Sequence, residues 1–492
     1  MRKRNQMMSS IFTKLDARKL GEVSSWLFPL SFVFSSFINL GFFYIGLAFE
    51  DNPIRSAGYI LGCIAFAVVS AVVLALALYS NPLRKSQWVL EILSACFFVF
   101  CLVYGVLRNG FGSTVFGYLK VFIVLVIPAF FTAGLCGIKR GEAAFFRNLE
   151  QTGFFCLPVV LVYVFWAVFN CNPFYRGIYL GFMNYMSFAY TIMPVLLAHI
   201  QQFSVEAPLR VPFLSRELPH PQVFRGIVIV LYWLAIIASG TRGAYVCVAV
   251  YCVFLFVNRL IRKQPAKRFF ALAALLASIL LFMVFIYTPP GFSSVGRMSS
   301  FVQGLAQGEF STSDMQAENI DEQIDDMLDG KITVSNQSQN AARPNTPQEA
   351  PNADSRNEAL EGELLNPDEE MQPVISDRST YYKLAFGEFS NAPLFGIGPG
   401  GYSQKYAAYP HNIVLEILCE TGLAGTLFLG VLMLLAVVRI LKYAICDENV
   451  CHILLFLMVY FIQANISGSV WQNATLLCFL GYGFALPPIR KK

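Results

Sequence analysis

Apolar runs of about 20 residues recur along the whole chain, and each is long enough to cross the ~30 Å hydrocarbon layer of a bilayer as an α-helix. Of the 492 residues, 56% are hydrophobic and only 14% are charged, whereas soluble proteins carry about 25% charged residues. A spanning segment has to satisfy its backbone polar groups internally, so runs of this length predict helices. The sequence therefore predicts an all-α polytopic membrane protein.

The runs predict twelve transmembrane helices, and the first is an uncleaved span. Trp26–Ala48 follows a basic segment, is too long for the core of a signal peptide and ends in no small-residue cleavage site. The predicted spans are 26–48, 57–79, 88–107, 117–138, 153–170, 177–200, 223–240, 242–259, 269–288, 413–438, 450–466 and 469–487.

The distribution of Lys and Arg predicts the orientation. With the N-terminus inside, the inner segments carry pairs and clusters, such as Arg84 with Lys85, whereas the short outer loops carry single arginines. Cytoplasmic loops are the ones enriched in these residues, and an even number of spans returns the basic C-terminal tail to the same side. We therefore expect both termini in the cytoplasm. Topology thus accounts for the net charge of +5, which does not indicate nucleic-acid binding.

The segment from Pro289 to His411 is the one long polar excursion, and the predicted orientation places it outside the cytoplasm. It carries 18 acidic and 7 basic residues. Its middle, residues 303–373, lacks the apolar content needed to offset chain entropy, so we expect a disordered acidic insertion. We expect ordered structure at both ends of the loop, near Phe292–Phe301 and Ser376–His411, with an amphipathic segment over 376–395. The predicted organisation is helices 1–9 over 1–288, the loop over 289–411, and helices 10–12 over 412–492.

Two arginines are candidate anion-binding groups. Arg242 lies in Ser-Gly-Thr-Arg-Gly-Ala, a tight step between two predicted spans at the outer face, where small neighbours leave room for a ligand. An arginine there is costly unless it is paired or binds an anion, such as a phosphate. Arg378 opens a segment in which Tyr382, Ala385, Phe386 and Phe389 fall on one helical stripe, typical of a helix on the membrane surface. The alternative for both arginines is interfacial anchoring.

A glycine-rich loop and a Pro-His-Asn step follow. Gly396–Gly401 matches G-x-G-x-x-G, but no strand precedes it, so we reject dinucleotide binding and expect a sharp turn beside a ligand or a helix end. Of the four histidines, only His411 is expected to face outward, where it is a candidate base for a hydroxyl. The alternative for His411 is a polar cap. Asn412, Glu416 and Glu420 share one helical face, and carboxylates in a membrane helix usually face a cavity or a partner.

Other polar residues collect at the outer ends of the predicted spans, and Asn184 lies within the sixth span. They suggest a polar cavity that opens outward, although interfacial Asn is common. The twelve cysteines lie almost entirely in apolar runs and form neither CxxC pairs nor zinc spacings. We therefore expect the cysteines to be small buried hydrophobic residues rather than metal ligands.

The ordered set of Ser239–Ala244, Arg378, the Gly-Ile-Gly-Pro-Gly-Gly-Tyr loop and Pro410–Gly425 resembles the O-antigen ligase superfamily. That group includes O-antigen ligases, repeat-unit polymerases and some protein O-oligosaccharyltransferases. Gly181–Asn184 is a weaker match. The chain departs from the family at Thr241, where serine is more usual, and in its long acidic insertion.

The resemblance implies a GT-C-like fold in a bacterial inner membrane with the large loop in the periplasm. It implies transfer of a glycan from undecaprenyl diphosphate without a metal or other cofactor. By motif, Arg242 and Arg378 would bind the diphosphate and His411 would act on the acceptor hydroxyl, with Asn412, Glu416, Gly398 and Asn184 in support.

Several functions fit this pattern. The acceptor of an O-antigen ligase is lipid A core, whereas that of a repeat-unit polymerase of O-antigen or exopolysaccharide is a second lipid-linked glycan. A protein acceptor is a weaker alternative. A flippase of lipid-linked sugars is disfavoured, because the chain shows no matching halves and its polar candidates gather on one outer face.

Overall fold

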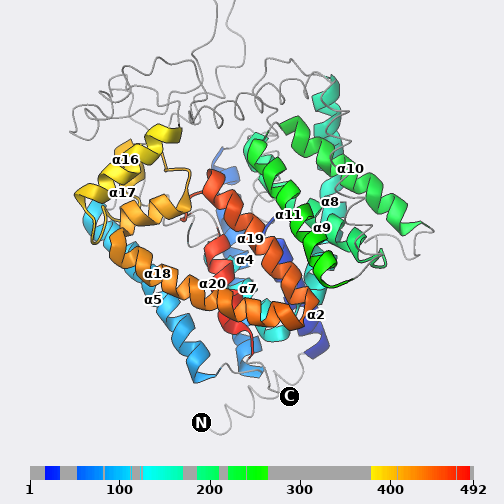
Figure 1. Cartoon of the computed structure of the whole chain (residues 1–492), viewed down its shortest axis with the longest axis horizontal. Helices are drawn as coiled ribbons and strands as arrows, with labels where there is room; N and C mark the ends of the chain where they lie inside the picture. Colours follow the sequence, from blue (N-terminus) through cyan, green and yellow to red (C-terminus); the bar gives the residue numbers. More distant parts are fainter. Residues whose placement is uncertain are drawn as a thin grey trace, which may run out of the picture. The chain divides into compact units, whose positions relative to one another are not determined.

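The computed structural model of the chain describes residues 17–33, 52–80, 84–110, 112, 122, 126–169, 185–209, 220–239, 241–263, 378–406, 408–471 and 474–487. All regular elements in these ranges are helices (Figure 1). Seven of them are long and apolar enough to cross a membrane, and Ile127–Lys139 and Leu476–Ala485 are shorter apolar helices. The predicted all-α polytopic membrane fold is confirmed.

Most predicted spans that fall in the described ranges correspond to helices. They are α4 (Asn52–Ser80), α5 (Lys85–Asn109), α7 (Ile127–Lys139), α8 (Glu142–Phe169), α9 (Tyr185–Ser204), α10 (Pro221–Ser239), α11 (Arg242–Ile261), α18 (Ile413–Cys446), α19 (Glu448–Ser467) and α20 (Thr475–Ala485). The first predicted span overlaps α2 (Ala17–Ser31). The predicted span 269–288 and the insertion 303–373 lie outside the described residues, so the count of twelve and the nature of the insertion stay predictions.

The chain divides into two compact units. Unit 1 comprises Met1–Ala95, Val121–Ser300 and Gly430–Lys492, and unit 2 comprises Cys96–Lys120 and Phe301–Leu429. The helices α5 and α18 each contribute residues to both units.

Unit 1 is a helical bundle with an aromatic-rich core, in which Phe145 packs against Phe28 and Phe456. Its helices α7 and α20 approach closely through glycines. A Cβ added at Gly481 would lie 2.5 Å from the carbonyl oxygen of Phe130, and one at Gly137 would lie 2.9 Å from that of Tyr482. Small residues at such contacts allow the backbones of membrane helices to meet.

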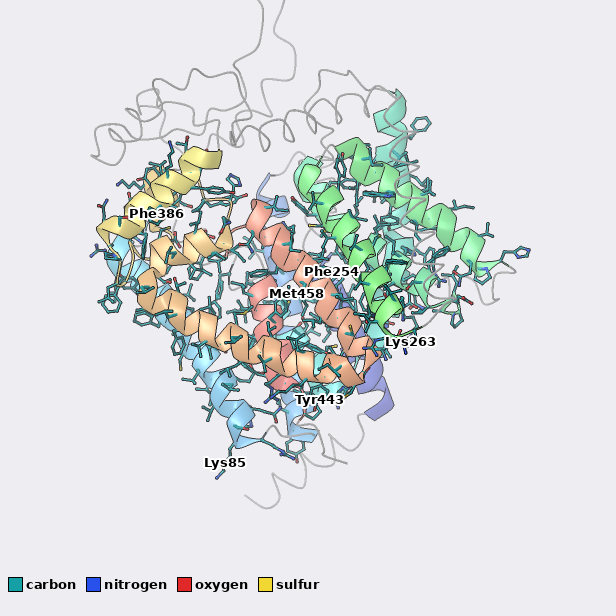
Figure 2. The ribbon with its side chains drawn as sticks, viewed as in Figure 1. Lys85, Phe254, Lys263, Phe386, Tyr443 and Met458 are labelled. Atoms are coloured by element: carbon teal, nitrogen blue, oxygen red, sulfur yellow. The ribbon has the colours of Figure 1, made fainter. Side chains whose placement is uncertain are left out.

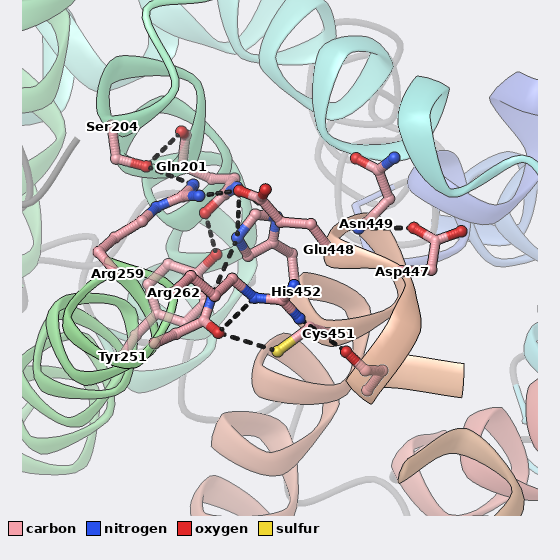
Figure 3. Close-up of polar contacts among 12 residues, drawn as sticks. Gln201, Ser204, Tyr251, Arg259, Arg262, Asp447, Glu448, Asn449, Cys451 and His452 are labelled. Atoms are coloured by element: carbon pink, nitrogen blue, oxygen red, sulfur yellow. Dashed lines mark hydrogen bonds and ion pairs between the residues drawn. The ribbon is translucent and has the colours of Figure 1, made fainter. Parts of the chain in front are cut away.

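Polar side chains tie the helix ends of unit 1 together. Arg259 at the end of α11 is buried and pairs with Glu448 in the first turn of α19 (Figure 3). His452, one turn later, lies 2.6 Å from the side-chain nitrogen of Gln201 on α9. Buried charges are tolerated when they are paired in this way. These contacts give His452 a structural role.

A second buried group joins α8, α9 and α10. The carboxylate of Glu150 accepts from Arg225 at 2.5 Å and 3.2 Å and lies 3.2 Å from Nδ1 of His199. Glu142 in the first turn of α8 accepts from the hydroxyl of Tyr482 at 2.9 Å. Because these carboxylates are satisfied, α8 extends well before residue 153, where its span was predicted to begin.

Unit 2 contains α16 (Arg378–Asn391), α17 (Gly401–Tyr406), the first part of α18 and the second half of α5 (Figure 1). Its small core is formed by Leu384, Ala385, Tyr402, Tyr406 and Cys419. The residues of the predicted α16 stripe divide between this core and the surface. Ala385 is buried, but Phe386 is 58% exposed and Leu384 takes its place in the core. Leu384 and Ala385 pack in this core against side chains of α17 and α18.

Candidate active site

The Pro-His-Asn step forms the start of α18. The side-chain oxygen of Asn412 accepts from the backbone N–H groups of Val414 at 3.0 Å and Leu415 at 3.1 Å. This is an N-cap, which satisfies two donors that the first helical turn leaves open. His411 immediately precedes the cap and has a φ of 56°, in the left-handed region that non-glycine residues rarely adopt. Such strain concentrates at functional sites, where the surrounding structure has to stabilise it.

Two tyrosines flank the His411 ring. The ring centroid of Tyr409 lies 4.2 Å from that of His411, and the centroid of Tyr381 lies 5.6 Å away. Tyr381 belongs to α16, one turn after Arg378, which is the first residue of that helix. The fold therefore brings the beginning of α16 next to His411, although the two are far apart in sequence. The structure describes the backbone of Arg378 but not its side chain.

The carboxylate of Glu388 fastens α16 to α17. It is 5% exposed and accepts from the ammonium of Lys405 at 2.6 Å and from the hydroxyl of Tyr406 at 2.5 Å. Burial and the hydrogen bond to Glu388 raise the pKa of Tyr406, so this hydroxyl remains a donor at any working pH. Glu388 thus fixes the helix that carries Arg378 and Tyr381.

Two hydroxyls extend this support to the residues around His411. Tyr402 on α17 donates to the carbonyl oxygen of Tyr381 at 2.9 Å, and Ser403 donates to that of Ala408 at 2.7 Å. Burial also raises the pKa of Tyr402 well above its usual value, so this phenol stays protonated. Both the chain segment before His411 and the tyrosine across from it are therefore held by α17.

The glycine-rich loop docks into a break in α18. Gly422 has a φ of 64° and a ψ of −168°, which interrupts two helical hydrogen bonds. Four bonds to residues 393–398 replace those two. The carbonyl oxygens of Cys419 and Glu420 accept from the N–H groups of Ile397 and Gly398, and the N–H groups of Leu423 and Ala424 donate to the carbonyl oxygens of Pro393 and Leu394. All four distances lie between 2.8 and 3.1 Å.

Glycines are required on both sides of this contact. A Cβ at Gly422 would lie 2.5 Å from backbone atoms of Leu394, and one at Gly396 would lie 2.4 Å from the carbonyl carbon of Glu420. Gly398 has a φ of 88° and lies against Arg108 and Asn109 of α5. The expectation of a turn beside a helix end is confirmed. The glycines allow the loop backbone to approach and hydrogen-bond the backbone of α18 at its break.

The two glutamates of α18 are buried, each with 1% exposure. One carboxylate oxygen of Glu420 accepts from the N–H groups of Gly400 at 3.0 Å and Tyr402 at 3.3 Å. These two bonds cap α17, so Glu420 orders the loop and the helix that support His411. The sequence did not single out Glu388, although a carboxylate within an aromatic segment is a signal of a buried partner.

The other predicted residues lie apart from this cluster in the chain. Arg242 begins α11 in unit 1, and the structure does not describe its side chain. The tight step before it is confirmed, because α10 ends at Ser239 and the Ser239 hydroxyl accepts from the N–H of Thr241 at 3.2 Å. Asn184 lies outside the described residues.

In a comparison with known protein families, a single family model covers the segments that contain Arg242, Arg378 and His411. Residues 227–430 match the family model described as O-antigen ligase, and this range contains Arg242, Arg378 and His411. No curated protein sequence matches the chain. The predicted resemblance to the O-antigen ligase superfamily is therefore confirmed over these residues.

Proposed function

We propose that the protein is a membrane glycosyltransferase that moves an oligo- or polysaccharide from undecaprenyl diphosphate to an acceptor hydroxyl on the periplasmic side. The observation that carries this proposal is the setting of His411. It lies at the start of a candidate membrane span, in a strained backbone conformation and between two tyrosines. The family match supports glycosyl transfer as the chemistry.

In the proposed reaction, His411 orients the acceptor hydroxyl and accepts its proton. The hydroxyl oxygen attacks the anomeric carbon of the donor, the bond from that carbon to the diphosphate breaks, and a glycosidic bond forms. The proton held on His411 then leaves to solvent or to the diphosphate. General base catalysis of this kind contributes roughly 10²–10⁴-fold to a rate.

Arg378 is proposed to stabilise the diphosphate, whose charge grows as the bond breaks. Its position supports this role, because Tyr381 lies one helical turn from Arg378 and packs against His411. A guanidinium contacts phosphate oxygens through paired donors and needs no metal ion to do so. Arg242 is assigned the same role on its sequence motif alone.

The supporting residues are proposed to hold the backbone around His411 in place. Asn412 caps α18, Gly398 docks the loop, and Glu416 is buried one turn beyond the cap. We keep Asn184 as a candidate on its sequence motif.

Reconstitution tests the proposal. The purified full chain in vesicles is given a glycan on undecaprenyl diphosphate and either lipid A core or a second lipid-linked glycan. We expect transfer to one acceptor, and equal transfer after a chelator removes divalent cations. Absence of transfer to both acceptors would refute the proposed function, and loss of transfer with the chelator would refute its independence of metal.

The main alternative is a repeat-unit polymerase, which differs only in its acceptor. Loss of the gene distinguishes the two. Unmodified core lipid with accumulated long polymer indicates a ligase, whereas single repeats on the core indicate a polymerase. A protein acceptor and a flippase of lipid-linked sugars are the weaker alternatives, and neither predicts transfer between two lipids in vesicles.

A further inference from the structure

The loop that docks at the break of α18 carries large apolar side chains on its outer surface. Leu394 is 57% exposed and Phe395 is 55% exposed. Phe386, on the neighbouring helix α16, is 58% exposed (Figure 2). Adjacent exposed apolar side chains such as Leu394 and Phe395 mark a surface that contacts another apolar phase.

The position of Leu394 and Phe395 beside α18 indicates that this apolar phase is lipid. The bonds from Leu423 to Pro393 and from Ala424 to Leu394 place the loop directly beside the first residues after the break. Leu423 and Leu427 are themselves 46% and 60% exposed, on a helix long and apolar enough to span the membrane. The loop residues therefore continue the lipid-facing surface of α18.

The length of α18 indicates how deep in the membrane the break at Gly422 lies. From Leu423 to Cys446 the helix is about 36 Å long at 1.5 Å per residue, enough to cross the ~30 Å hydrocarbon layer without the turns before the break. The break at Gly422 then lies near one edge of that layer. Because α18 is kinked at Gly422, the turns between His411 and the break follow a different direction from the span.

Irregular backbone is excluded from lipid unless its polar groups are satisfied. This loop meets that condition. Its N–H groups at Gly396, Ile397 and Gly398 donate to carbonyl oxygens, and its carbonyl oxygens at Pro393 and Leu394 accept from α18. The carbonyl oxygen of Gly396 accepts from the hydroxyl of Tyr104 on α5 at 3.1 Å. A loop with an exposed apolar tip and internally bonded backbone is suited to enter a bilayer.

We propose that residues 392–398 form a re-entrant loop whose tip, Leu394 and Phe395, inserts into the leaflet on the side of His411 and contacts acyl chains together with Phe386. This surface sets the depth of α16 and α17 at the membrane edge. The proposal concerns lipid contact alone and does not depend on the proposed reaction.

Site-specific photocrosslinking tests it in the full chain in its membrane. Benzoylphenylalanine replaces Phe395, and adducts are identified by mass after irradiation. We expect phospholipid adducts at a yield similar to that of the same probe at Leu427, and several-fold above that at Gln404, an exposed polar position of α17. The probe at Leu394 repeats the measurement should the first variant fold poorly.

Two outcomes would overturn the proposal. A lipid yield at residues 394 and 395 no higher than at Gln404 would place the loop in water. Adducts to protein, from a second copy or another partner, would show that this surface is covered by a polypeptide. Glycan transfer by wild-type protein is measured separately, so either outcome leaves the proposed function standing.

Discussion

Replacing Gly422 with alanine tests how the break in α18 is built. The backbone at Gly422 lies in a region that only glycine occupies readily, with a φ of 64° and a ψ of −168°. Holding another residue there costs about 1–3 kcal/mol. The added Cβ would also meet Leu394 backbone atoms at 2.5 Å and the Phe395 nitrogen at 2.6 Å.

These neighbours cannot move away easily, because Leu394 is itself hydrogen-bonded to Ala424. Overpacking of this kind typically costs about 1–3 kcal/mol. The two effects together predict that Gly422→Ala lowers the free energy of unfolding by about 2–6 kcal/mol. Loop undocking also frees α17, so glycan transfer should fall with stability.

Gly430→Ala is the matched control in the same helix. A Cβ there meets nothing within 4 Å, and alanine is favoured over glycine inside a helix by up to about 1 kcal/mol. Unfolding of both purified variants is followed in mixed micelles by circular dichroism. Equal stabilities of the two variants would refute the account of the break.

The remaining predictions concern the site around His411. Arg378→Ala should reduce the transfer rate roughly 10²–10³-fold. The control is Lys383→Ala, at an exposed position of the same helix, whose transfer rate should stay within about twofold of wild type. Equal losses in the two variants would contradict a role of Arg378 in diphosphate stabilisation. Tyr409→Ala should lower kcat by roughly 10–100-fold through misplacement of His411, and Tyr409→Phe, which keeps the ring, should retain most activity. Glu388→Gln should destabilise the protein by about 1–3 kcal/mol in thermal unfolding, because a charge-assisted acceptor is lost. Deletion of residues 303–373 should leave insertion and transfer largely intact; full loss of transfer with normal insertion would place the insertion in the site.

Hydropathy predicted the fold class and the approximate spans, because lipid imposes length and composition on every crossing helix. Hydropathy did not predict helix breaks or helix ends at which polar groups are hydrogen-bonded by residues far away in the sequence. The apolar run across 413–438 hides the break at Gly422, since the replacement hydrogen bonds come from residues 393–398. The beginning of α8 was missed for the same reason, because the Glu150 carboxylate pairs with Arg225 and lies 3.2 Å from Nδ1 of His199.

For the site, the sequence predicted His411 and Arg378 from their residue types and from their order in the chain. It could not predict that Tyr381 packs on His411, because that contact depends on how α16 docks. The support of that docking by Glu388 was likewise not predictable, since Glu388 acts through Lys405 and Tyr406 of α17, which belong to no motif. Glu420 was expected to face a cavity or a partner, but its contacts with the N–H groups of Gly400 and Tyr402 could not be predicted.

The most direct test of the central claim is glycan transfer by His411→Ala in reconstituted vesicles, with His220→Ala as the control at an exposed histidine before α10. The proposed role predicts that His411→Ala loses roughly 10²–10⁴-fold in transfer rate while folding and inserting normally, and that His220→Ala keeps the wild-type rate. Transfer by His411→Ala at a rate close to wild type would contradict the assignment of this histidine as the group that acts on the acceptor.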